Sequence, residues 1–260
     1  MLRPRIIPCL LVRNKGLVKT VKFNASKYIG DPINAVKIFN EKEADELIVL
    51  DIDATTNKKV PDFVMIQKLA AECRMPLCYG GGIKTVEQAI KIIGLGVEKV
   101  AISSEAIANP LLISSIADEI GNQSVVVILD VKKNIFGKYE VMTHNGKKKT
   151  GTSPVKFAKQ AEKLGAGEIV INSIDQDGRM QGYDLTLASK IREAITIPMT
   201  VLGGAGTLSD IKKLVTHFSV IGAAAGSTFV FKGKYRAVLI NYPNQEQKDK
   251  ISLAALDQNR

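Results

Sequence analysis

The stretch Val125-Val126-Val127-Ile128-Leu129-Asp130-Val131 decides the fold class of this chain. Five apolar residues lead into a single acid, which is typical of a parallel strand that is buried on both faces and ends in a carboxylate. In α/β barrels, working carboxylates stand at the C-terminal ends of strands. The run Ile6-Ile7-Pro8-Cys9-Leu10-Leu11-Val12 has the same pattern, but Leu11 stands where Asp130 would be.

Such apolar runs alternate with amphipathic helical patterns along the chain, which is typical of successive βα units with a parallel sheet. The expected strands lie near residues 5–12, 46–51, 77–80, 98–103, 125–131, 168–173, 199–203 and 220–225. The expected helices lie near residues 32–44, 61–73, 85–95, 109–120, 153–164, 184–195, 207–216 and 233–240. Eight strands in 260 residues predict an α/β fold, a (β/α)8 or TIM barrel. We expect one domain over residues 1–260, with 243–260 as a C-terminal tail.

The chain also repeats itself. Residues 44–51 return as 166–173 at an offset of 122, whereas Gly80-Gly81-Gly82 returns as Gly203-Gly204-Ala205, and Ser103-Ser104 aligns with Gly226-Ser227, at an offset of 123. The repeat predicts a barrel built from two fused half-barrels. An offset of 119 makes Leu11 the equivalent of Asp130.

Composition narrows the function classes. The net charge is +10, but the basic residues are scattered, which favours a solvated surface over a nucleic-acid or membrane site. Three cysteines without zinc-ligand spacing, and only two histidines, predict free thiols and neither a metal nor a cofactor. The N-terminal apolar run is too short for a signal peptide, and no run reaches about 18 apolar residues, so we expect a cytoplasmic protein.

Two kinds of candidate site residue stand at strand ends. The paired Gly-rich loops can bring backbone N–H groups close to an anion, so they predict a substrate with a phosphate at each end, although glycines also serve plain turns. The strand-end acids can act in proton transfer. They are Asp51, Asp53, Asp130, Asp175 and Asp177. A cap or a salt bridge explains Asp53 and Asp175 equally well, whereas Asp130 has no such duty. Lys19, in the long loop after the first strand, could pair with phosphate.

Several motifs together resemble HisF, the cyclase subunit of imidazole glycerol phosphate synthase. They are Arg5-Ile6-Ile7-Pro8-Cys9-Leu10, Gly30-Asp31-Pro32, Ala44-Asp45-Glu46-Leu47, Leu50-Asp51-Ile52, Gly80-Gly81-Gly82-Ile83, Asn109-Pro110, Gly165-Ala166-Gly167-Glu168, Ser173-Ile174-Asp175-Gln176-Asp177-Gly178, Gly182-Tyr183-Asp184-Leu185 and Gly203-Gly204-Ala205-Gly206. The resemblance covers roughly residues 3 to 240. It implies an enzyme, a lyase-type cyclase in histidine biosynthesis, whose glutaminase partner, HisH, docks on the N-terminal face of the barrel as a heterodimer. Ammonia then travels through the barrel to a bis-phosphorylated substrate.

The resemblance also implies roles for individual residues. Substrate and phosphate contacts fall on Lys19, Asp51, Gly82, Ser103, Ser104, Asn172, Asp177, Gly178, Gly204 and Ser227. Ser103 and Asn172 replace the family's usual Asn and Thr. An ammonia gate at the channel entrance falls on Arg5, Glu46, Lys99 and Glu168.

One departure matters. HisF cyclases use two aspartates as acid and base, and only Asp130 is present because the other position holds Leu11. The leading hypothesis is therefore an ammonia-delivering HisF paralogue that works with a HisH-like glutaminase and a sugar amidotransferase in amidino-sugar and lipopolysaccharide biosynthesis. The alternative is a working cyclase that relies on Asp130. A HisA-like isomerase is less favoured, because it also needs an aspartate at position 11 and lacks the channel ring, and a basic binding module without enzymatic activity is the least favoured alternative.

Overall fold

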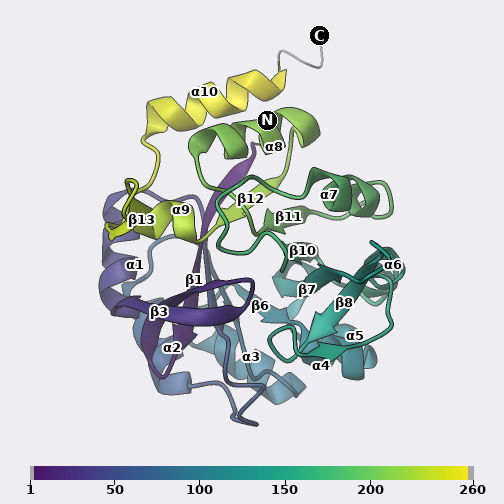
Figure 1. Cartoon of the computed structure of the whole chain (residues 1–260). Coiled ribbons are helices and arrows are strands. Elements are labelled where there is room, and N and C mark those ends of the chain that lie inside the picture. The colour runs from purple at the N-terminus through teal and green to yellow at the C-terminus, as the bar shows by residue number, and fades with distance from the viewer. Residues whose placement is uncertain (1–2, 257–260) are drawn as a thin grey trace.

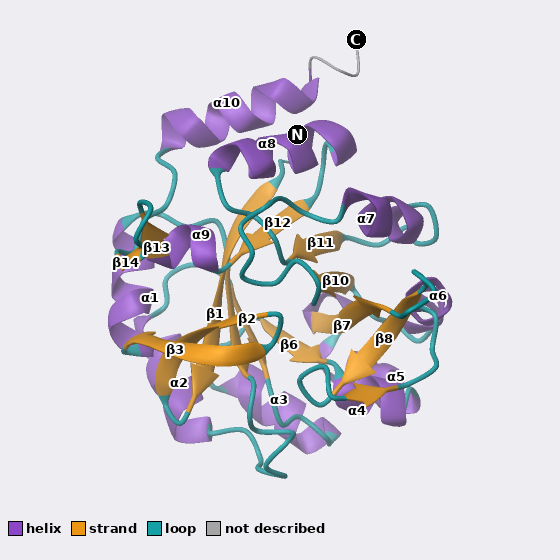
Figure 2. Cartoon of the chain, viewed as in Figure 1, coloured by secondary structure: helices purple, strands orange, loops and turns teal. Residues whose placement is uncertain are grey.

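Eight parallel strands close into a barrel in the computed structural model, which describes residues 3–256 (Figures 1 and 2). The strands are β1 (Arg5–Arg13), β4 (Leu47–Asp51), β5 (Leu77–Gly80), β6 (Lys99–Ile102), β7 (Val125–Lys133), β10 (Glu168–Ser173), β11 (Met199–Leu202) and β12 (Gly222–Ala225). They pair in the order β10-β11-β12-β1-β4-β5-β6-β7, and pairing of β10 with β7 closes the ring. The predicted TIM barrel is confirmed.

Seven of the expected helices surround the barrel. They are α1 (Pro32–Glu41), α2 (Phe63–Glu72), α3 (Val86–Gly94), α5 (Leu111–Ile120), α6 (Pro154–Lys163), α7 (Leu185–Arg192) and α8 (Leu208–Phe218). Side-chain caps start several of them: Asp31 accepts a hydrogen bond from the backbone N–H of Asn34, and Thr85 and Gln88 form a capping box. Helical starts are therefore encoded locally, before any packing against the strands.

The eighth expected helix, over residues 233–240, is wrong. The short helix α9 (Ser227–Val230) is followed by a hairpin of β13 (Phe231–Lys232) and β14 (Ala237–Val238). Gly233 has a left-handed φ of 74°, and Val238 and Leu239 are about half exposed, so the segment has a turn residue and lacks a buried helical stripe.

The outer position of the eighth helix is instead taken by the expected tail. Helix α10 (Gln245–Leu256) packs against α8, and Ile251 is buried there (Figure 1). Residues 257–260 of that tail lie outside the described residues. Tyr242 ties this C-terminal segment to the first strand, because its hydroxyl donates to the carbonyl oxygen of Ile6 at 2.7 Å.

Several short elements extend the loops that follow the barrel strands. A hairpin of β2 (Gly16–Val21) and β3 (Asn24–Gly30) replaces the long loop expected after β1, and β8 (Tyr139–Thr143) and β9 (Lys148–Lys149) extend β7. A helix α4 (Ser104–Ala108) and a 3-10 turn η1 (Asn122–Ser124) complete the list. β3 is largely exposed, so it lacks the buried apolar run by which the barrel strands were recognised.

The barrel interior between its two ends is apolar. Inward-pointing side chains from all eight strands form one buried cluster. Its members are Ile7, Cys9, Ile48, Cys78, Ala101, Val126, Ile128, Val170, Leu202 and Ala224. Leu11 and Leu50 pack against this cluster at the C-terminal end and are half-buried. The interior is therefore a packed hydrocarbon layer that separates the two polar ends.

Strand registers test the predicted repeat. Leu11 lies opposite Leu50 across β1 and β4, and Asp130 lies opposite Asn172 across β7 and β10. Leu50 and Asn172 differ by the 122 residues that relate β4 to β10, so the equivalence of Leu11 with Asp130 is confirmed.

The Gly-rich loops correct the predicted offset. Strand β5 ends at Gly80 and β11 ends at Leu202, and the left-handed glycines that follow are Gly81 and Gly82 in one half and Gly203 and Gly204 in the other. The loops therefore match at an offset of 122, and the expected 123 is wrong by one residue. The geometry explains the match, because a Cβ on Gly81 or Gly203 would lie 2.4 or 2.7 Å from the carbonyl oxygen that ends the neighbouring strand.

Among residues 3–256, no helix is long and apolar enough to cross a membrane.

Candidate functional site

A pocket opens at the C-terminal end of the barrel, with a volume of about 1240 Å³ including its mouth. The structure brings all eleven residues expected at a catalytic or substrate-binding site into its walls. They are Lys19, Asp51, Gly82, Ser103, Ser104, Asp130, Asn172, Asp177, Gly178, Gly204 and Ser227. These residues come from the ends of all eight barrel strands or the loops that follow them, so only closure of the barrel places them together.

Asp130 is the acid with the most unusual surroundings. Its Oδ1 accepts a hydrogen bond from Nδ2 of Asn172 at 2.9 Å. Burial raises the pKa of Asp130 to about 7, Asn172 and Ser103 oppose the rise through hydrogen bonds, and the nearby charge of Asp177 adds to it. A carboxyl group that titrates near neutral pH can both accept and donate a proton there.

Leu11 lies in the same pocket wall, with its side chain against the apolar layer below. The nearest strand-end acid on that side, Asp51, is already engaged, because its Oδ1 accepts from the backbone N–H groups of Asp53 and Ala54, both at 3.1 Å. Burial raises the pKa of Asp51, and those two hydrogen bonds oppose the rise. At position 11 the pocket wall therefore holds leucine, and the neighbouring carboxyl group of Asp51 is held by two backbone N–H groups.

Lys19 extends inward from β2. Its side chain is buried, and Nζ donates to the carbonyl oxygen of Cys9 at 2.6 Å. Burial lowers the pKa of Lys19, while the charge of Asp177 acts in the opposite direction. A Cβ on Gly226 would lie 2.2 Å from that Nζ, so glycine at this position makes room for the amine.

Asp177 links the loop after β10 to the hairpin after β1. It accepts hydrogen bonds from Oγ1 of Thr20 at 2.8 Å and from the backbone N–H of Phe23 at 3.2 Å. Gly178 permits the approach, since a Cβ there would lie 2.2 Å from the carbonyl oxygen of Thr20. Thr20 was not predicted as a site residue, and its position beside Lys19 was the available signal. His144 and Asn145, from the turn after β8, also line the pocket and were not predicted.

Asp53 and Asp175 have structural contacts. Asp53 forms a salt bridge with Arg13, Nε to Oδ2 at 2.8 Å, and Asp175 accepts from the backbone N–H of Lys133 at 2.8 Å. The salt-bridge and turn interpretation of these two acids accounts for their contacts, and neither lines the pocket.

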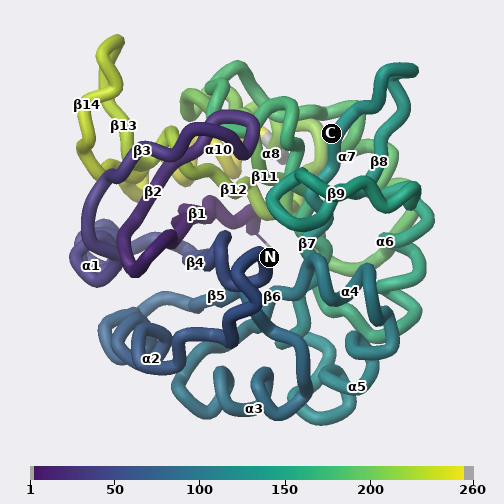
Figure 3. The backbone as a smooth tube through the Cα atoms, turned by 60° about the horizontal axis from the view of Figure 1, so that its bottom comes forward, coloured from purple at the N-terminus to yellow at the C-terminus, as the bar shows by residue number. Residues whose placement is uncertain are grey.

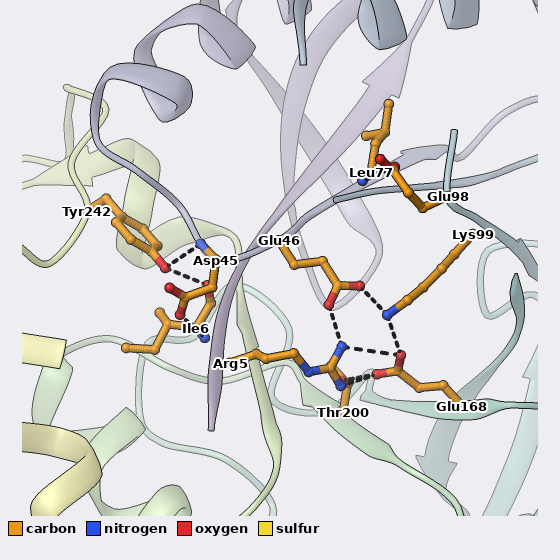
Figure 4. Close-up of polar contacts among 10 residues, drawn as sticks. All are labelled: Arg5, Ile6, Asp45, Glu46, Leu77, Glu98, Lys99, Glu168, Thr200 and Tyr242. Atoms are coloured by element: carbon orange, nitrogen blue, oxygen red, sulfur yellow. Dashed lines mark hydrogen bonds and ion pairs between the residues drawn. The ribbon is translucent and has the colours of Figure 1, made fainter. Parts of the chain in front are cut away.

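Four charged side chains meet at the opposite, N-terminal end of the barrel (Figure 4). Arg5 pairs with Glu46 and, at 2.7 Å, with Glu168, whereas Lys99 pairs with Glu46 at 2.8 Å and with Glu168 at 2.9 Å. Cations and acids therefore alternate in a closed ring, hereafter the charged ring. Thr200, which was not predicted, donates its hydroxyl to Glu168. A hydroxyl at the start of a buried strand was the signal for it.

Burial of these charges is tolerated because they neutralise one another. Both glutamates are nearly inaccessible to solvent. Burial by itself raises the pKa of Glu168, but Arg5, Lys99 and Thr200 outweigh it and lower the pKa to about 2. The same glutamates raise the pKa of Lys99 against the effect of its own burial. Each acid of the charged ring is paired with both cations, and the ring closes the apolar interior at this end.

Known proteins resemble this chain over nearly its whole length. Residues 5–236 match the family described as histidine biosynthesis protein. A Vibrio vulnificus (strain YJ016) protein named "Putative imidazole glycerol phosphate synthase subunit hisF3" is 60% identical over 251 residues, which cover 96% of each chain. The Alkaliphilus metalliredigens (strain QYMF) protein named imidazole glycerol phosphate synthase subunit HisF is 40% identical over 229 residues, 88% of this chain and 91% of that one. This chain belongs to the histidine biosynthesis protein family and, within it, to the HisF proteins, a family of enzyme subunits.

Proposed function

We propose that this chain is the synthase subunit of a glutamine amidotransferase complex, in which it carries ammonia through the barrel to an acceptor at the C-terminal pocket. A HisH-like glutaminase on the N-terminal face would supply the ammonia. One combination of features carries the proposal: the charged ring and the apolar interior are intact, while Leu11 replaces one of two expected catalytic acids.

The interior suits neutral ammonia. An apolar layer admits a small uncharged molecule far more readily than an ammonium ion, because an unpaired charge loses its hydration there. Entry requires that one ion pair of the charged ring opens. Since Lys99 contacts both Glu46 and Glu168, it can release one glutamate and remain paired with the other.

The pocket suits a ligand with two phosphates. The left-handed glycine loops after β5 and β11 lie in its wall, as do Ser104 and Ser227 at the starts of α4 and α9. We assign the phosphate contacts to Gly82, Ser104, Gly204 and Ser227. We assign the remaining contacts with the ligand to Lys19, Asp51, Ser103, Asn172, Asp177 and Gly178, and proton transfer to Asp130.

Leu11 argues against efficient ring closure. General acid–base assistance is typically worth about 10²- to 10⁴-fold in rate, and leucine can neither donate nor accept a proton. The ammonia then has another use, and we assign it to an amidotransferase that forms an amidino sugar for surface polysaccharide. The second candidate is an active cyclase in histidine biosynthesis. It is favoured by the pKa of Asp130 near 7, which would let one carboxyl group serve as both acid and base.

Cyclase assays with the ribulosyl formimino substrate and free ammonia separate the two functions. We expect the turnover rate of the unaltered protein to be lower than that of the Leu11→Asp variant by a factor of about 10² or more. Leu50→Asp is the matched control, because it adds a carboxylate on the neighbouring strand at the same depth without restoring the pair. Turnover of the unaltered protein at the rate of an ordinary cyclase would refute the conduit function and establish the second candidate.

A further inference from the structure

Two hairpins at the C-terminal end of the barrel expose large apolar side chains to solvent. The turn between β7 and β8 presents Ile135 and Phe136, which are 91% and 80% exposed, and the turn between β13 and β14 presents Tyr235, which is 90% exposed. In Figure 3 both hairpins extend toward the top of the view, one on each side, with the β2–β3 hairpin between them. Both belong to loops that surround the pocket, since they follow β7 and β12.

The first of these turns is ordered. The side-chain oxygen of Asn134 accepts from the backbone N–H groups of Phe136 and Lys138, both at 3.0 Å, and the backbone N–H of Asn134 donates to the carbonyl oxygen of Lys138 at 2.9 Å. Holding a large apolar side chain outward gives up the favourable free energy of burying it. The exposure of Phe136 is therefore imposed by a built turn.

Basic side chains flank the exposed tips. Lys138 follows Phe136, and Lys234 and Arg236 flank Tyr235; all three are exposed, and none forms a salt bridge with any residue between 3 and 256. Hereafter, the rim surface means these three cations together with Ile135, Phe136 and Tyr235.

The charge of the whole barrel is polarised in the same sense. The segments at the C-terminal ends of the strands hold 18 Lys or Arg against 10 Asp or Glu, over residues 13–31, 51–62, 80–85, 103–110, 130–153, 173–184, 203–207 and 226–244. The segments at the N-terminal ends of the strands, with the charged ring included, hold 5 against 6, over residues 3–5, 42–46, 73–76, 95–99, 121–124, 164–168, 193–198 and 219–221. The positive field of the molecule is thus concentrated around the pocket mouth, where it would steer an acidic partner into place.

We propose that the rim surface docks an acidic protein, which holds the ammonia acceptor and covers the mouth of the pocket. The inference rests on the proposed function. Ammonia that left an open mouth would be protonated by water and lose its nucleophilic lone pair, and position 11 of the pocket holds leucine where a second catalytic acid is expected. An enzyme seated on the mouth meets both needs. Three apolar side chains on two separate tips offer little area for a bilayer, whereas Phe136 and Tyr235 match the aromatic anchors that dominate protein interfaces.

The test uses the full chain with a photo-crosslinking amino acid at position 136, and with the same group at position 253 as a control. Leu253 is also exposed, at 58%, but lies on α10, away from the barrel loops. We expect position 136, but not 253, to cross-link one acidic protein in cells that express the chain. That protein is then purified and its affinity for the chain is measured across a salt series.

Two sets of variants define the expected result. The charge-reversal variant combines Lys138→Glu, Lys234→Glu and Arg236→Glu; it should weaken binding about tenfold or more and reduce the salt dependence of the affinity. The apolar variant combines Phe136→Ser and Tyr235→Ser and should also weaken binding about tenfold or more. The control set reverses three exposed lysines on the outer helices, Lys68→Glu, Lys156→Glu and Lys159→Glu, and should leave the affinity unchanged.

Three outcomes would overturn the proposal. The first is that cross-links at position 136 match those at position 253, and the second is that the purified protein binds the unaltered chain and the rim variants with equal affinity. The third is that the chain binds phosphatidylglycerol vesicles while no protein is cross-linked, which would make the rim surface a lipid contact. Binding of the glutaminase is measured in the same preparations. If the glutaminase does not bind while the acidic protein does, the proposed ammonia supply fails and the docking surface stands.

Discussion

Replacing Arg5 by methionine tests whether the charged ring stabilises the fold by compensating two buried glutamates. In the ring, Glu168 has its pKa lowered from 4.5 to about 2, against its burial, and Arg5 is the largest cause of the lowering. At about 1.4 kcal/mol per pKa unit, that shift corresponds to about 3 kcal/mol of stability at pH 7. Because Lys99 remains, we expect the Arg5→Met variant to lose about 2–3 kcal/mol, near the low end for a broken buried pair.

The measurement is urea unfolding at several pH values. The pKa of Glu168 is lower in the folded than in the unfolded chain, so its contribution is complete above about pH 4.5 and is lost as the pH falls toward 2. The stability difference between the unaltered protein and Arg5→Met should therefore be constant from pH 6 to 8 and shrink below about pH 4.5. Arg3→Met is the matched control, because the salt bridge of Arg3 with Asp249 is exposed and is worth less than about 1 kcal/mol.

A double variant sharpens the test. Adding Glu168→Gln to Arg5→Met removes the charge that the first change leaves without a partner, so the double variant should lose less stability than the sum of the two single changes. The reasoning would be refuted by a loss at pH 7 no larger than that of Arg3→Met, or by a difference that stays unchanged at pH 3.

Three further predictions concern the rest of the barrel. The pKa of Asp130 is raised to about 7, so its ionisation opposes folding and the free energy of unfolding should fall as the pH rises from about 4 to 7. The Asp130→Asn variant should abolish that fall and, after allowance for solvent in the pocket, gain about 2 kcal/mol at pH 8, as measured by urea unfolding. Gly204→Ala should cost about 3 kcal/mol or more in thermal unfolding, because φ is 113° and the new Cβ would lie 2.0 Å from the carbonyl oxygen of Gly182; a cost below about 1 kcal/mol would contradict the steric argument. Tyr242→Phe should lower the free energy of unfolding by about 1–2 kcal/mol, since it leaves the buried carbonyl oxygen of Ile6 without this donor. Protection of the α10 amides from hydrogen exchange should fall as well, whereas unchanged protection would show that α10 is held independently of this bond.

Local patterns in the sequence determined the barrel and most of its pocket. Buried parallel strands need continuous apolar runs, which marked all eight strands, and the runs ended at the residues that line the pocket. The half-barrel repeat identified Leu11 as the equivalent of Asp130 without any coordinates, because register follows from strand periodicity. Where a segment lacked such a pattern, prediction failed: residues 233–240 form a hairpin, and the outer helix is α10.

Only the tertiary structure decided the electrostatics. Arg5, Glu46, Lys99 and Glu168 are up to 163 residues apart, and nothing local sets which cation contacts which acid or that Thr200 joins them. The pKa of Asp130 depends on burial by the loops that enclose the pocket, and burial is a property of the assembled barrel. The sequence alone showed which groups are present, whereas Coulomb and desolvation energies depend on distances and surroundings that exist only once the barrel has closed.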